Sequence, residues 1–298
     1  MAFLKYSNLP IFAKFDAEQT DPVKNTANNL FAASEASLSL DANLTTTRYL
    51  GSSAAEMPAS GPLEGKMSFT FYPLIEKADN NASINLQKSN QLAFFKLTGD
   101  FSVGHNIYFS NFLLKKSYLQ NYSMKINSYQ PISISANFIS YDTSSITNTK
   151  MVESTNVPQI AKNKQQSTFE GLHALTTTFS SPDSDSYLPD LKISIEINVD
   201  CNRSPVYQLG QSIASKAILN TVERTITIQG ENIGKVIDLN GKLANFKLAF
   251  NPLSAINAPA ATPVYEIQTL NAKVVSQQLS VSQGSNLNGR VVIKEIIL

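Results

Sequence analysis

The sequence predicts a mainly β protein that contains two tandem copies of one β-rich domain. Several segments alternate apolar and polar residues with a period of two, which is typical of strands with one buried face. Short sequence cues also recur in the same order, roughly 150 to 160 residues apart, and such recurrence indicates an internal repeat. The length of 298 residues fits two domains as well.

The first recurring cue is the sequence Leu92-Ala93-Phe94-Phe95-Lys96-Leu97, which returns as Leu243-Ala244-Asn245-Phe246-Lys247-Leu248 with five of six positions unchanged. The alternating segment 38–43, followed by Leu50-Gly51, matches segment 197–202, followed by Leu209-Gly210. Three further matches complete the order: residues 68–71 with 225–228, Lys115 with Lys273, and residues 132–135 with 291–294. Different loop lengths explain the unequal spacing.

These cues divide the chain into four parts. We expect an N-terminal arm over residues 1–34, a first β domain over 35–142, a linker over 143–170 and a second β domain over 171–298. The linker is polar and has no periodicity, which is ordinary between two domains and unusual inside one.

Individual elements follow from alternation and from turn residues. In the first domain we expect strands around 38–42, 69–72, 107–117, 118–127 and 132–141, with a loop at 52–62 and a short helix at 79–89. In the second we expect strands at 192–199, 225–229, 242–250, 265–273, 274–282 and 290–298, a break near Pro205, a short helix at 212–219 and a loop at 251–263.

The composition excludes several functional classes. Hydrophobic residues make up 42% of the chain, enough for two ordinary cores. Charged residues are only 16%, the net charge is +1, and no run of Lys and Arg exists to bind a phosphate backbone tightly. No apolar run approaches the ~20 residues of a membrane span, so we expect no membrane partner.

We find no convincing catalytic, metal or cofactor motif, and therefore predict a protein that is not an enzyme and needs no cofactor. His105 and His173 occupy non-equivalent places in the repeat and lack neighbouring ligands at metal spacing. Cys201, the only cysteine, matches Ala42 in the other copy, which indicates a small packing position. Asp183 and Asp185 lie in a Ser/Pro-rich loop, and residues 230–235 are one residue short of a phosphate-binding loop.

Two features resemble the tail tube proteins, and related structural proteins, of tailed phages. One is the segment 112–123 together with the alternating segment 130–138; the other is an alternating strand that ends in Leu50-Gly51 and is followed by Ser68-Phe69-Thr70-Phe71-Tyr72. The resemblance is one of strand types and lengths, and it extends through most of both halves. It implies two tandem homologous antiparallel domains, each a β-sandwich or rolled sheet with a short flanking helix.

The resemblance also implies a function. Such domains form six-fold rings that stack into a hollow tube, through which the genome DNA passes without specific binding. A duplicated chain supplies two domains, so we expect trimeric, pseudo-six-fold rings in the phage tail, assembled in the host cytoplasm. The partners implied are other copies of the chain and the tape-measure, sheath or baseplate proteins.

Physical arguments agree with a ring. A lone antiparallel sheet has exposed edges, and closure into a ring removes them. About four strands from each of six domains, at roughly 4.8 Å per strand, give a diameter of about 37 Å before tilting, which admits a duplex roughly 20 Å wide. A conduit must not hold DNA, so we expect acidic and uncharged polar residues to line the pore, with Asp41 and Asp200 as candidates.

The alternative interpretation is a two-domain β binding module, such as a phage baseplate, fibre or decoration protein or a bacterial adhesin. In that case the loops at 52–62 and 251–263 would be the contact sites. A ring with a hollow centre distinguishes the tube from a monomer or trimer with a solid centre.

Overall fold

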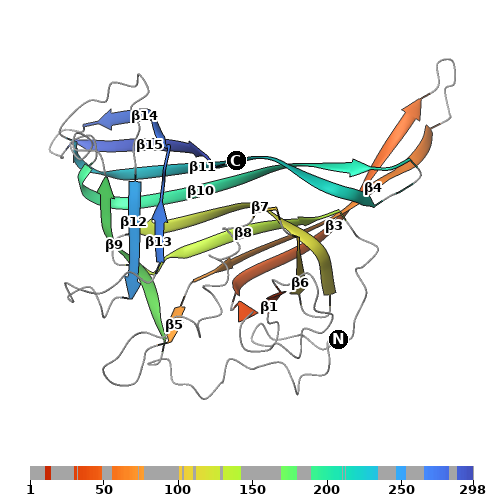
Figure 1. The fold of residues 1–298 in the computed structure, drawn as a ribbon, viewed down its shortest axis with the longest axis horizontal. Coiled ribbons are helices and arrows are strands. Elements are labelled where there is room, and N and C mark those ends of the chain that lie inside the picture. Colours follow the sequence, from red (N-terminus) through yellow and green to blue (C-terminus); the bar gives the residue numbers. More distant parts are fainter. Residues whose placement is uncertain are drawn as a thin grey trace.

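The structure is a computed structural model that describes residues 11–14, 30–31, 33–48, 56–72, 74–76, 101–102, 104–109, 112–127, 130–141, 169–179, 189–209, 211, 213–233, 246–252, 265–281 and 287–297. Every regular element in these ranges is a β-strand, and every strand pair is antiparallel (Figure 1). The prediction of a mainly β protein with antiparallel sheets is therefore confirmed.

The fifteen strands form an eleven-stranded sheet and a four-stranded sheet. Their bounds are β1 Ile11–Lys14, β2 Leu30–Phe31, β3 Ala33–Arg48, β4 Glu56–Phe71, β5 Leu74–Glu76, β6 His105–Phe109, β7 Phe112–Asn127, β8 Ser133–Ser140, β9 Phe169–Phe179, β10 Pro189–Tyr207, β11 Ala214–Ile233, β12 Phe246–Pro252, β13 Tyr265–Gln268, β14 Lys273–Ser280 and β15 Asn288–Ile296.

Eight strands of the larger sheet form one continuous surface, which we call the main sheet. Its order is β3-β4-β8-β7-β10-β11-β15-β14. The other three strands, β6, β1 and β2, branch from the first part of β7. The branch begins where Lys116 adopts a φ of 46°, a left-handed conformation that bends β7 away from the main sheet.

One face of the main sheet is apolar because its strands alternate. In β15, for example, Val291 and Ile293 are buried, while Arg290 and Lys294, which flank this pair, are exposed. The four-stranded sheet, ordered β13-β12-β9-β5, runs across the main strands (Figure 1). Its buried Leu248, Phe250 and Ile267 belong to the same hydrophobic core.

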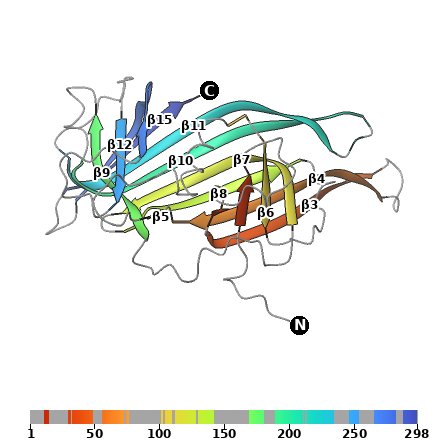
Figure 2. The ribbon, with the colours of Figure 1, turned by 60° about the horizontal axis from the view of Figure 1, so that its bottom comes forward.

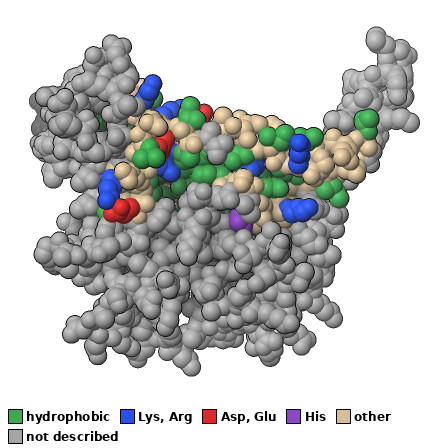
Figure 3. Space-filling model, in the orientation of Figure 1, with side chains coloured by type: hydrophobic (Ala, Val, Ile, Leu, Met, Phe, Trp, Pro, Cys, Tyr) green, Lys and Arg blue, Asp and Glu red, His purple; other side chains and the backbone are tan. Residues whose placement is uncertain are grey.

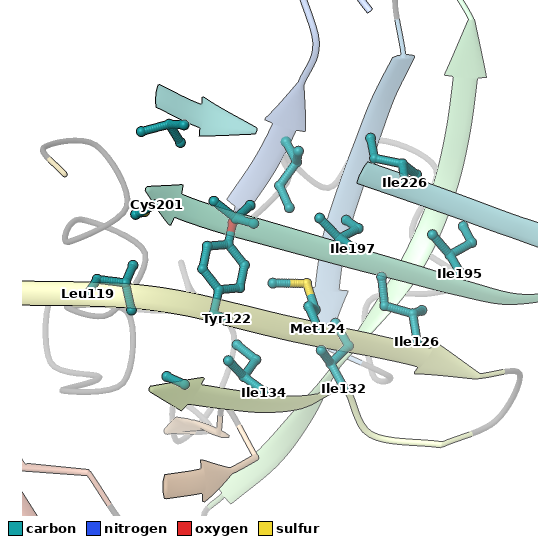
Figure 4. Close-up of a cluster of buried hydrophobic side chains, with 14 of the residues drawn as sticks. Leu119, Tyr122, Met124, Ile126, Ile132, Ile134, Ile195, Ile197, Cys201 and Ile226 are labelled. Carbon is teal, nitrogen blue, oxygen red and sulfur yellow. The ribbon is translucent and has the colours of Figure 1, made fainter. Parts of the chain in front are cut away.

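The middle of this core lies under four neighbouring strands. Figure 4 shows side chains of β7, β8, β10 and β11 that project to one side of the sheet, with Met124, Ile134 and Ile197 at the centre. Further along β4 and β8, the rings of Phe69 and Phe138 stack with their centroids 5.6 Å apart. Burial of each such side chain stabilises the fold by about 1.5–3 kcal/mol.

Two hairpins continue beyond the core. The β3–β4 and β10–β11 pairs extend past the other strands at the same end of the sheet, as Figures 1 and 2 show. Leu209, in the turn between β10 and β11, is fully exposed.

Several predicted elements differ from the structure. The helix expected at 212–219 is wrong, because residues from Ala214 onward pair with β10 as the start of β11. The described residues contain no helix, and the helix expected at 79–89 lies outside them. The break near Pro205 is also wrong, since Pro205 lies within β10, opposite Ala217.

Four other expected segments also differ from the structure. Residues 56–62 of the expected loop at 52–62 belong to β4, where a register shift accommodates Gly61 and Pro62. The two strands expected at 107–117 and 118–127 are instead β6 and a single long β7. β1 and β2 lie within the expected arm, and β9 begins at Phe169, inside the expected linker.

The stacked aromatic pair generates a stability prediction. Phe138→Ala removes a side chain that is 1% exposed, so we expect the free energy of unfolding to fall by about 3–5 kcal/mol in urea denaturation followed by circular dichroism. Tyr72→Ala, at a half-exposed position, is the control and is expected to change it by less than about 0.5 kcal/mol. Equal effects of the two changes would contradict the assigned core.

Candidate assembly edges and a polar sheet face

The main sheet consists of two four-strand groups with the same strand order. The first group is β3-β4-β8-β7 and the second is β10-β11-β15-β14. In each group the first two strands of the chain form a hairpin, the second pairs with the fourth, and the fourth pairs with the third. The groups meet where β7 pairs with β10.

Two register shifts fall at matching positions in the two groups. The β3·β4 pair shifts between Ala33 and Glu35, and the β10·β11 pair shifts at the corresponding step from Lys192 to Ser194. A second β3·β4 shift, after Ala42, lies one position from the counterpart of the β10·β11 shift after Asn202, and β10·β11 has a further shift after Val206. The β7·β8 pair shifts between Leu119 and Asn121, and the β14·β15 pair shifts between Val274 and Ser276. Because bulges are specific local features, these coincidences align the groups residue by residue.

This structural alignment agrees with some of the matches proposed from the sequence and differs from others. Segments 38–43 and 197–202 do correspond, and so do Ala42 and Cys201. Residues 68–71, however, correspond to 227–230, residues 132–135 correspond to 287–290, and Lys273 corresponds to Tyr118. Residues 92–97 lie outside the described residues. Among the described strands, the counterpart of β12 is β6, because β6 pairs with β7 as β12 pairs with β13.

The junction between the groups is a fully packed strand pair. It places Ile126 opposite Ile195, Met124 opposite Ile197, and Tyr122 opposite Val199, and all six side chains are buried. On the other face, Lys125 lies opposite Glu196, whose carboxylate accepts a hydrogen bond from the Ser123 hydroxyl at 3.4 Å. Opposite charges directly across a strand pair stabilise it.

The outer strands of the main sheet are the counterparts of the two junction strands. Strand β14 corresponds to β7 and strand β3 corresponds to β10, and each has a single neighbour among the described strands. Leu279 and Val281 match the buried Met124 and Ile126, but they are 41% and 72% exposed. Leu40 matches the buried Val199 and is 55% exposed.

We call these two outer strands the free edges. Sequence reasoning identified both strands but missed that their apolar residues remain exposed. The signal that could have identified the edge is the match of Leu279 with Met124. Both positions are apolar, but among the described strands only Met124 has a second strand beside its own.

The second face of the main sheet, the polar face, carries the side chains that alternate with the core. Most are small and uncharged: Ser37, Ser39, Ser68, Thr70, Asn121, Ser123, Ser133, Ser135, Asn137, Ser194, Asn198, Thr225, Thr227, Gln229, Ser276, Gln278 and Ser280. Many form lateral hydrogen bonds, such as Ser37 with Ser68 at 2.6 Å and Thr70 with Ser135 at 2.9 Å.

Carboxylates outnumber cations on the polar face. The described carboxylates are Glu35, Asp41, Glu64, Glu196, Asp200, Glu223 and Glu231, and the described cations are Lys66, Lys125, Lys273, Arg290 and Lys294. On the surface drawn in Figure 3, Lys and Arg side chains of the described residues stand apart, separated by hydrophobic and uncharged polar groups. The described residues of this surface therefore form no continuous basic stripe of the kind that tight DNA binding requires.

The two predicted pore residues occupy corresponding positions on the polar face. Asp41 on β3 matches Asp200 on β10. Lys66 donates to Asp41 at 2.9 Å, and this hydrogen bond raises the pKa of Lys66 above its usual value. Thr225 takes the place of Lys66 in the second group, so Asp200 has no cation at the matching position.

A depression of about 240 Å³ lies where the junction pairing ends. Its lining includes Asp200, Cys201 and Arg203 from β10 and Asn121 from β7. The Arg203 guanidinium lies over the Tyr118 ring, 4.9 Å from its centroid, and Nε donates to the Leu119 carbonyl at 3.4 Å. The bulges of both strands produce this opening, and Arg203 uses it to join β10 to β7.

The turn before β14 is held by a buried ion pair. Arg224 on β11 donates from Nη1 to Glu295 on β15 at 2.9 Å and to the Gln268 carbonyl at 3.2 Å. The other carboxylate oxygen of Glu295 accepts the Leu270 amide at 2.9 Å. These bonds fix the entry of the chain into the free edge β14.

The residues considered for catalysis are not brought together. His105 is buried on β6, and His173 lies on β9 of the other sheet. Cys201 is buried on β10, and Asp183 and Asp185 lie outside the described residues. Within the described ranges, no three His, Cys, Asp or Glu residues gather as a metal site, and no helix has the length and apolarity needed to cross a membrane.

No protein-family model matches the sequence, and no curated protein is significantly similar to it.

The buried thiol gives a chemical prediction. Burial raises the pKa of Cys201 from 9.0 to about 11, so the thiol stays protonated at neutral pH and is a poor nucleophile. We expect native protein to react slowly with Ellman's reagent and unfolded protein to react at once. Because the unfolded thiol ionises first, this group also lowers the stability of the native state as the pH rises through that interval. Rapid labelling of the native protein would contradict the packing role.

Proposed function

We propose that this protein is a structural subunit of a phage tail tube, in which two duplicated, tube-like β domains of each chain join those of other chains in stacked rings. One observation carries the proposal: strands β7 and β10 join the two groups in a packed junction, and their counterparts β14 and β3 are the free edges. An edge with exposed apolar residues favours pairing with another chain.

Ring closure accounts for both free edges at once. Each copy supplies eight strands to the main sheet, so three copies supply about 24, and a closed ring of strands leaves no edge. A heterologous contact between one edge and the other closes into a ring when its rotation allows closure. We therefore favour trimeric, pseudo-six-fold rings.

The polar face suits the lining of a conduit. The apolar face is packed against the strands of the smaller sheet, which leaves the polar face for a water-filled channel. Its carboxylates, including Asp41 and Asp200, outnumber its cations, so DNA that passes would gain little counterion-release affinity. We propose that these two residues lie in the channel wall.

The remaining parts of the proposal follow from the same assignment. The location is the virion tail, after assembly in the host cytoplasm, and the molecular partners are other copies, tape-measure, sheath or baseplate proteins, and double-stranded DNA in transit. The chemistry of the site requires no catalysis and no cofactor.

Electron microscopy tests the assembly. Purified full-length protein, examined by negative stain and by light scattering, is expected to form rings or tubes with a hollow centre. Particles that remain monomeric, or trimeric with a solid centre, would contradict the tube and favour a two-domain binding module.

A charge substitution tests the channel lining. Asp200→Lys places a cation on the polar face, whereas Gln208→Lys places one at the exposed end of the β10–β11 hairpin. We expect only Asp200→Lys to increase retention of a short fluorescent duplex by assembled rings. Each new phosphate contact steepens the dependence of log affinity on log salt by about 0.9. Equal retention by both variants would show that Asp200 does not face the DNA.

A further inference from the structure

We propose that β14 of one copy pairs antiparallel with β3 of the next copy, in the register that the internal β7·β10 junction already uses. This register places Val281 opposite Ala36, Leu279 opposite Leu38, and Ser276 opposite Asp41. The inference rests on the proposed function and deepens it, because it names the partner surface and the residues that meet.

The register follows from the matched bulges. Alignment of β14 on β7 places Ser276 on Asn121 and Leu279 on Met124. Alignment of β3 on β10 places Leu38 on Ile197 and Asp41 on Asp200. The junction pairs Met124 with Ile197 and Asn121 with Asp200. Substitution of each residue by its counterpart on β14 or β3 then gives the proposed pairs directly.

Burial gives an independent argument for the same alignment. At the junction, Met124, Ile126 and Val199 are each 6% exposed or less. Their counterparts Leu279, Val281 and Leu40 are three of the large hydrophobic residues that remain exposed on the described surface. Pairing in the proposed register would place all three on the apolar face, beside Leu38, which already packs against the core.

The side chains on the polar face also tolerate this register. Ser37 meets Ser280 and Ser39 meets Gln278, in the places where Glu196 meets Lys125 and Asn198 meets Ser123 at the junction. No pair brings like charges together. A slip of one residue would instead pair Leu279 with Ser37 or Ser39, whose side chains lie on the polar face, which makes the register strongly specified.

The occupant of each free edge is a second copy and not the other edge of the same molecule. The two edges are the first and last strands of the eight-strand order. Figures 1 and 2 show the main sheet as an open surface, with β3 and β14 on opposite margins.

Engineered disulfides test the register in the full-length chain. The background is Cys201→Ala, which places at that position the residue found at its counterpart, Ala42. The test variant adds Ser37→Cys and Ser280→Cys, and the slipped variant adds Ser39→Cys and Ser280→Cys. A third variant, Lys125→Cys with Glu196→Cys, places a disulfide within the junction itself and controls for the geometry of this type of pair.

We expect the test pair to form intermolecular disulfides about tenfold faster than the slipped pair, because diagonal residues lie too far apart to bridge without backbone movement. Intermolecular products appear as a ladder on non-reducing gels, while the junction pair forms a disulfide within one chain. Faster cross-linking of the slipped pair would overturn the register.

Two results separate this inference from the proposed function. Hollow rings in which the junction pair oxidises and the test pair does not would overturn the register and leave ring assembly standing. Solid-centred particles whose test pair cross-links at the expected rate would support the edge pairing and overturn the tube.

Discussion

A β-strand has hydrogen-bonding groups on two sides, and a strand at the margin of a sheet offers one row of them to whatever approaches. Most of this molecule can be understood from how that requirement is met. The hairpins satisfy one side of each strand, the branch and the smaller sheet cover the apolar face, and the β7·β10 junction makes two groups into one surface. Within the main sheet, β3 and β14 are the two described strands that lack a second neighbour, and both carry exposed apolar residues.

The sequence predicted the strand content, because alternation is a local signal. It aligned segment 38–43 with 197–202 correctly, since all six positions keep the same polar or apolar character. It misplaced residues 68–71 by two positions and 132–135 by four. Even displacements preserve which face a side chain occupies, so alternation cannot detect them, and only the bulges resolve them.

Turn signals were less informative than pairing. Gly61 and Pro62 indicated a loop but lie in β4, and residues 214–219 resembled a helix but extend β11. In both cases the neighbouring strand imposed an extended conformation on residues with a different local preference. The candidate edges were invisible for another reason. Whether Leu279 is buried depends on which strand lies beside it, and that is a property of topology that a single segment does not encode.

The β7·β10 pair has a thermodynamic consequence for any closed assembly. In such an assembly, one of every two contacts between four-strand groups lies within a single chain. The chain holds the two strands of that contact at high effective concentration, so their pairing needs no encounter between molecules. A ring closed from three such chains therefore loses less translational and rotational entropy than a ring assembled from six separate four-strand groups. The two groups also differ in detail, since the Lys66–Asp41 contact is present in only one of them.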